Sequence, residues 1–186
     1  MLNKLIEALE EAIDFLEKNN YRYVVIGGLA NTFWGIARAT HDIDLKVLIE
    51  EGKYQEFKEK AYSKFETRKL PVQSPLIVAV IASNSVGIDF LLSVPGYEVN
   101  TFERAVRHQI NNLQIWLCSP EDLIIHKAIA NRDKDWVDIE GVLIEQVKKI
   151  DIEYVEKWLS QFADALEKPE ILNRFLMLFK QIVSSA

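Results

Sequence analysis

Asp42 and Asp44, two aspartates separated by one residue, are the side chains of this 186-residue chain best suited to bind a metal ion or to take part in catalysis. They enter an apolar run, Leu45–Leu48, that predicts a β-strand. Residues two apart in a strand project from the same face, so both carboxylates point the same way. Adjacent ionised carboxylates repel each other unless a cation lies between them, and Mg²⁺ is a hard ion that prefers such oxygen ligands. The pair therefore predicts a metal site for Mg²⁺, with Mn²⁺ as a substitute.

Two glycines and a third acid stand in a fixed order around this pair. Gly27 and Gly28 follow an apolar run and lack a Cβ atom, so a phosphate can approach their backbone closely. Asp89 lies in the middle of the strand-like segment Ser85–Leu92. Because burial of an isolated carboxylate is costly, Asp89 needs a partner, and a metal shared with the aspartate pair would supply one. The order predicts a metal–nucleotide site.

This order of motifs resembles the DNA polymerase β-like nucleotidyltransferase superfamily. Its signature is an apolar strand, Gly-Gly or Gly-Ser, a helix, Asp-x-Asp on the next strand and a carboxylate on a later strand. The resemblance implies transfer of a nucleoside monophosphate from a nucleoside triphosphate to a hydroxyl acceptor, RNA or protein. It implies that Asp42, Asp44 and Asp89 are catalytic and hold the metal. Asp89 is either a metal ligand or the base that removes the acceptor proton, and both roles stay open.

A second group of residues is similar to the motifs of abortive-infection nucleotidyltransferase toxins of the AbiEii type. The spacing GG-x-A-x(7)-R-x-T-x-D-I-D places Arg38 and Thr40, and Lys127, Arg132, Asp135 and Asp138 follow in a helical region. The resemblance implies a toxin of a toxin–antitoxin or phage-defence system, with an antitoxin as partner. It also implies that the nucleotide is bound by Gly27, Gly28, Arg38, Thr40, Lys127 and Asp135. In this reading Lys127 is a partly solvated ligand of the phosphates.

Several of these residues also have a structural interpretation. Asp135 is suited to begin a helix as its N-cap, with Asp138 satisfying the first turn. Arg38 either orients the aspartate pair, contacts phosphate or lies on the surface, and Lys127 is otherwise an exposed helix position. Two other classes of function stay open for the whole chain. One is a nucleotide-binding pseudoenzyme, and the other is an antitoxin-like interaction protein with incidental acids.

Composition limits the class of protein. With 49% hydrophobic residues, the chain can bury a substantial core. A net charge of −6 argues against a general nucleic-acid coat protein, which would present a broad basic face. The single cysteine, Cys118, excludes an internal disulfide and suits a reducing compartment. We find no secretory signal and no segment long enough to span a bilayer, so we expect a cytoplasmic protein without membrane association.

The apolar pattern predicts an α+β (mixed α/β) fold, with a mixed sheet flanked by helices and a C-terminal helical cap. We expect a nucleotidyltransferase-like core over residues 1–118 and a helical segment over 119–186, packed on the core as one compact unit. Helices are predicted over residues 2–18, 29–36, 53–63, 120–131, 135–148, 152–165 and 170–183. Strands are predicted over residues 21–26, 42–48, 76–81, 86–92, 107–110 and 113–117.

Overall fold

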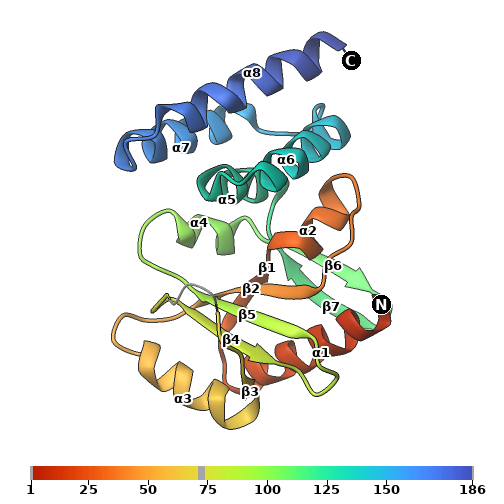
Figure 1. Cartoon of the computed structure of the whole chain (residues 1–186), viewed down its shortest axis with the longest axis vertical. Helices are drawn as coiled ribbons and strands as arrows, with labels where there is room; N and C mark the ends of the chain where they lie inside the picture. Colours follow the sequence, from red (N-terminus) through yellow and green to blue (C-terminus); the bar gives the residue numbers. More distant parts are fainter. Residues whose placement is uncertain (1, 71–73, 186) are drawn as a thin grey trace. The chain divides into compact units, whose positions relative to one another are not determined.

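The computed structural model describes residues 2–70 and 74–185 (Figure 1). Contacts divide the chain into two units. The first comprises Met1–Leu29 and Ala39–Cys118, and the second comprises Ala30–Arg38 and Ser119–Ala186. The predicted mixed α/β class is confirmed, and the chain is helical from Pro120 onward. Packing of the helical segment on the core stays a prediction.

The first unit is built on a seven-stranded mixed sheet in the order β3-β4-β5-β2-β1-β7-β6. The strands β2 and β5 pair in parallel, as do β1 and β7, and the other pairs are antiparallel. The strands are β1 (Arg22–Val25), β2 (Asp42–Leu48), β3 (Glu66–Thr67), β4 (Ile77–Ile81), β5 (Gly87–Leu92), β6 (Val106–Ile110) and β7 (Leu113–Leu117). The unit also contains the helices α1 (Leu2–Lys18), α3 (Tyr54–Lys64) and α4 (Glu98–Glu103).

One face of this sheet forms the core, and its alternation decides where the acids lie. Ile43 on β2, with Ile88 and Phe90 on β5, is fully buried. Phe90 packs against Phe15 of α1 and Phe57 of α3, with ring centroids 5.9 and 5.5 Å away, so both helices cover this face (Figure 1). Because side chains alternate along a strand, the residues between these apolar positions project from the opposite face.

The second unit consists of helices. They are α5 (Pro120–Ala130), α6 (Asp133–Gln146), α7 (Ile152–Ala165) and α8 (Pro169–Ser185), and α2 (Gly27–Trp34) ends in this unit. Ser119 caps α5, since its Oγ accepts the Asp122 backbone N–H at 3.1 Å. A Cβ at Gly35 would lie 2.9 Å from the backbone nitrogen of Val142, and one at Gly141 would lie 3.0 Å from that of Ile36. This close approach of two backbones holds residues 30–38 against α6.

Several element boundaries differ from those predicted. The first strand is shorter, and α2 begins at Gly27 rather than at residue 29. The helix α6 begins at Asp133 because α5 ends at Ala130, and the left-handed φ of 53° at its C-cap residue Asn131 lets the chain turn at once. Neither β3 nor α4 was predicted, because elements of two and six residues show no usable periodicity. The strands β4 and β5 form one hairpin and β6 and β7 form another, with positive φ at Ser85 and at Asn111 in their turns.

Among the described residues, every helix is too short or too polar to traverse a membrane.

Candidate functional site

The register of two strands brings the three predicted acids to one face of the sheet. Asp44 on β2 lies opposite Asp89 on β5, and Asp42 lies opposite Gly87. Partners in register on parallel strands project from the same face, so Asp42, Asp44 and Asp89 lie together opposite the apolar core. All three are half-buried, whereas Ile43 and Ile88 between them are inaccessible to solvent.

The glycine pair lies directly against this acidic face. Gly27 has a φ of +68°, which favours glycine, and a Cβ there would lie 2.0 Å from Asp44 Oδ2. A Cβ at Gly28 would lie 2.5 Å from the hydroxyl of Thr40, which donates to the backbone oxygen of Asp42 at 3.3 Å. The two glycines thus let the N-terminus of α2 begin beside Asp44. Backbone N–H groups at a helix N-terminus favour anions such as phosphate.

Arg68 is a site residue that the sequence pattern did not reveal. Its Nη2 donates to Asp89 Oδ1 at 2.6 Å. A Cβ at Gly87 would lie 2.5 Å from Asp42 Oδ1 and 3.1 Å from Arg68 Cζ, so this glycine admits both charged groups. Burial raises the pKa of Asp89 above its ordinary value, whereas Arg68 opposes this rise and the charge of Asp42 adds to it. No motif marks Arg68, because it reaches Asp89 only through the pairing of β3 with β4.

Only part of this acidic face is suited to bind a hard divalent cation. Asp42 and Asp44 supply carboxylate oxygens on one face, the ligands that Mg²⁺ prefers. Asp89 is instead paired with Arg68. Within residues 2–70 and 74–185, no group of three or more His, Cys, Asp or Glu side chains is placed to hold a metal ion. The expected convergence of all three carboxylates on one cation therefore requires Arg68 to move away from Asp89.

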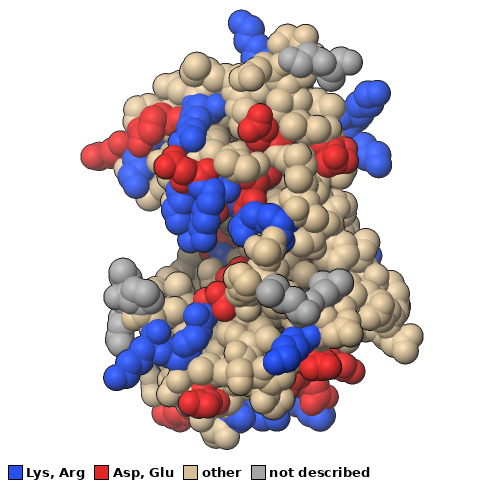
Figure 2. Space-filling view, turned by 45° about the vertical axis from the view of Figure 1, so that its right-hand side comes forward, with Lys and Arg blue, Asp and Glu red and all other residues tan. Residues whose placement is uncertain are grey.

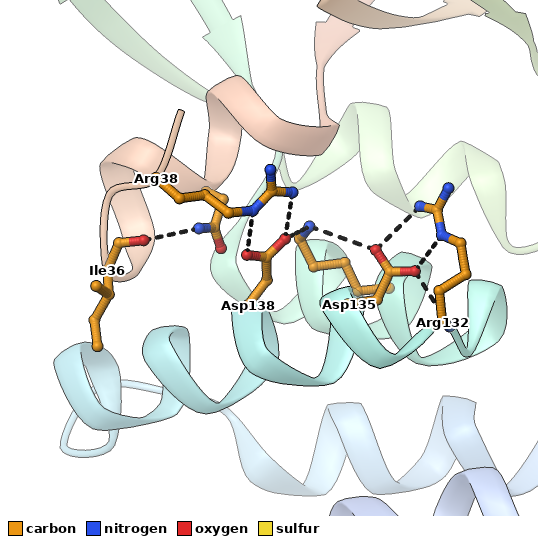
Figure 3. Close-up of polar contacts among 7 residues, drawn as sticks. Ile36, Arg38, Arg132, Asp135 and Asp138 are labelled. Atoms are coloured by element: carbon orange, nitrogen blue, oxygen red, sulfur yellow. Dashed lines mark hydrogen bonds and ion pairs between the residues drawn. The ribbon is translucent and has the colours of Figure 1, made fainter. Parts of the chain in front are cut away.

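The predicted nucleotide ligands of the second unit form a chain of alternating charges (Figure 3). Arg38 donates through Nε and Nη2 to the two carboxylate oxygens of Asp138, at 2.7 and 2.8 Å. Lys127 Nζ donates to Asp138 Oδ2 at 2.6 Å and lies 3.9 Å from Asp135 Oδ1. Asp135 in turn accepts two hydrogen bonds from the Arg132 guanidinium, at 2.5 and 3.0 Å. The network joins α5 and α6 to the segment that follows α2.

Two expectations about this network need correction. Lys127 is 5% exposed, so it is a buried ion-pair partner of Asp138 rather than a partly solvated lysine. Asp135 is not an N-cap, since it is the third residue of α6 and accepts the backbone N–H of Arg132 at 3.3 Å. Asp138 lies beyond the first turn and binds Arg38 and Lys127. Contacts of Arg38, Lys127 and Asp135 with a nucleotide stay predictions.

The Asp138 network predicts an acid-dependent loss of stability. Burial raises the pKa of Asp138, but hydrogen bonds from Arg38 and Lys127 lower it more, and the net shift is downward. A folded-state pKa below the unfolded value near 4 gives stability that is present above about pH 4. This stability is lost as the pH falls through the folded pKa. Urea unfolding from pH 7 to pH 3 should show a smaller loss for Asp138→Asn than for the parent, and equal losses would contradict the assignment.

Comparisons with known proteins agree with this fold. The sequence matches the family described as "Nucleotidyltransferase of unknown function (DUF6036)" over residues 3–185. The solution structure of the antibiotic-resistance factor ANT(2″)-Ia is similar, with a TM-score of 0.62 and 14% identity over 91% of this chain and 97% of that one. An antigenic nucleotidyltransferase-like protein from Paracoccidioides brasiliensis has a TM-score of 0.52 and 16% identity, over 91% of both chains.

The lincomycin-bound lincosamide antibiotic adenylyltransferase LnuA has a TM-score of 0.52 and 13% identity, over 73% of this chain and 94% of that one. Identities this low show a shared fold and not a shared substrate. Among curated proteins no match was found. Since the family match spans nearly the whole sequence, the chain belongs to the family of nucleotidyltransferases of unknown function described as DUF6036.

Proposed function

We propose that the protein is a metal-dependent nucleotidyltransferase that moves a nucleoside monophosphate from a nucleoside triphosphate to a hydroxyl acceptor. One observation carries the proposal: Asp42, Asp44 and Asp89 share a half-buried sheet face, with Gly27 packed against the Asp44 carboxylate. An acidic face beside a helix N-terminus is suited to a cation and a phosphate together. The family and the fold support this assignment.

In this proposal Asp42 and Asp44 hold Mg²⁺, or Mn²⁺ in its place. When bound, the ion would neutralise the triphosphate and stabilise the charge on the departing pyrophosphate. The backbone of Gly27 and Gly28 contacts the phosphates, and Thr40 supports the turn beside Asp42. The resemblance to the AbiEii-type toxins further assigns contacts with the nucleotide to Arg38, Lys127 and Asp135.

Asp89 is the proposed base. Arg68 occupies its Oδ1, so Oδ2 is the atom that would take the proton from the acceptor hydroxyl. The acceptor oxygen then attacks the α-phosphorus, and pyrophosphate leaves. A carboxylate whose pKa is raised by burial accepts a proton more readily than an ordinary aspartate. The alternative role, a third metal ligand, requires the ion pair with Arg68 to open.

The motif resemblance supports a finer proposal, that the enzyme is an AbiEii-type toxin of the cytoplasm. Its acceptor would then be RNA or a protein, and its partner an antitoxin. A nucleotide-binding pseudoenzyme is the second candidate. It is favoured by one observation, namely that Arg68 already neutralises the third carboxylate.

The test is a transfer assay with each of the four α-³²P-labelled nucleoside triphosphates, Mg²⁺, and either total RNA or cell lysate. We expect label on the acceptor, release of pyrophosphate, and loss of both when EDTA is added. Calorimetry with the same nucleotides separates the candidates, because a pseudoenzyme binds a nucleotide without transferring it. No binding of any triphosphate with Mg²⁺ or Mn²⁺ would refute both.

A further inference from the structure

A basic pocket lies in the first unit, next to the proposed base. Its volume is about 540 Å³, within the usual range for a small-ligand site. The helix α3 contributes Lys58 and Tyr62, the segment after β3 contributes Arg68 and Lys69, and β4 contributes Ala79. Three cations line this α3–β4 pocket, and no acid is among its described lining residues. The pocket is therefore suited to an anion.

Arg68 and Ala79 place the pocket beside Asp89. Ala79 is the register partner of Asp89 on the neighbouring strand, and Arg68 donates its backbone N–H to the Ala79 oxygen at 3.0 Å. The Arg68 guanidinium donates to Asp89, while its Nε makes no hydrogen bond with a described residue. Arg68 therefore lines the pocket and contacts the base at the same time. A ligand in the pocket would lie next to Arg68, whose guanidinium also contacts Asp89.

An aromatic ring distinguishes this pocket from a plain anion site. Tyr62 is 44% exposed, although tyrosine rings are readily buried. It lines the pocket together with Lys58, which is half-buried. Proteins bind single-stranded nucleic acids by stacking bases on aromatic rings while cations contact the phosphates. A polycationic acceptor would instead meet three like charges.

We propose that the α3–β4 pocket binds one nucleotide residue of a single-stranded nucleic-acid acceptor, beside the hydroxyl that receives the nucleoside monophosphate. Lys58, Arg68 and Lys69 contact its phosphates, and Tyr62 stacks on its base. This inference rests on the proposed function and specifies its acceptor. On the face shown in Figure 2, basic and acidic side chains are interspersed without a broad basic area. Binding therefore depends on this local site and not on a general basic surface.

The test compares a fluorescein-labelled RNA trinucleotide with a methylphosphonate trinucleotide of the same sequence, which carries no backbone charge. Fluorescence anisotropy with the full chain should show at least about tenfold weaker binding of the uncharged probe. The double variant Lys58→Gln/Lys69→Gln should weaken binding of the RNA probe about tenfold. It should also reduce the slope of log K against log salt by about 0.7, because each phosphate contact contributes about 0.7 and Arg68 keeps its own contact. Tyr62→Ala should weaken binding about tenfold without changing that slope.

The double variant Lys148→Gln/Lys149→Gln is the matched control, because it removes the same charge at two exposed positions. Equal weakening by both double variants, or none by Lys58→Gln/Lys69→Gln, would overturn the proposal. Calorimetry with Mg²⁺ and nucleoside triphosphate separates this inference from the proposed function. If the parent binds no triphosphate, the proposed function fails. If the parent transfers label only to protein, the inference alone fails. It also fails alone if the parent labels RNA and the pocket variants keep the parent KM for RNA.

Discussion

Lys127→Ala should lower the free energy of unfolding by about 3–5 kcal/mol, the cost of leaving a buried charge without its partner. Lys127 and Asp138 are 5% and 3% exposed, and their charged atoms lie 2.6 Å apart. Removing the ammonium group leaves Asp138 paired with Arg38 alone, whereas Asp135 keeps its closer partner Arg132 (Figure 3). Urea denaturation followed by circular dichroism would measure the loss. If Lys127 were an exposed surface residue, its replacement would hardly change the free energy of unfolding.

Two variants define the cause of this loss. Lys148→Ala removes an exposed lysine and should change the free energy of unfolding by less than about 0.5 kcal/mol. The pair Lys127→Met with Asp138→Asn removes both buried charges and should recover much of the stability, because no unpaired buried ion then remains. If Lys127→Ala is as stable as the Lys148→Ala control, the buried ion pair is not a feature of the folded protein.

Asp44→Asn should reduce nucleotide transfer by about 10³-fold or more. Asparagine keeps the shape that packs against Gly27 but removes one of the two charges proposed to hold the metal. Loss of several kcal/mol of metal stabilisation in the transition state corresponds to a rate loss of this size. Initial rates of label transfer measure the effect. Calorimetry with Mg²⁺ and the preferred triphosphate should show binding reduced to the level without metal.

Asp14→Asn is the matched control for that experiment. Asp14 is an exposed acid on α1 that pairs with Lys18, and its substitution makes the same change in net charge. It should leave transfer unchanged. Metal-dependent binding of equal affinity in Asp44→Asn and in the parent would contradict the role of Asp44, whatever the acceptor.

Features that depend on local backbone geometry could be predicted from the order of the residues. Alternation along a strand is a property of the extended chain, so the shared face of Asp42 and Asp44 followed from their spacing alone. The burial of Ile43 between them and of Ile88 beside Asp89 shows the same alternation. The N-cap of α5 is local as well, because the Ser119 hydroxyl bonds to the backbone N–H and the carboxylate of Asp122, three residues ahead. Most helix and strand positions could be predicted for this reason.

The groups that neutralise the charges depend instead on contacts between segments far apart in the chain. Arg38 and Asp138 are 100 residues apart, and they meet because residues 30–38 pack against α6 through the close approach of Gly35 and Gly141. Arg68 reaches Asp89 through a two-residue strand that has no periodicity to recognise. The ion pair of Lys127 with Asp138 likewise depends on the packing of α6 against α5. Ion-pair partners depend on strand register and helix packing between distant segments, and no local pattern of residues carries that information.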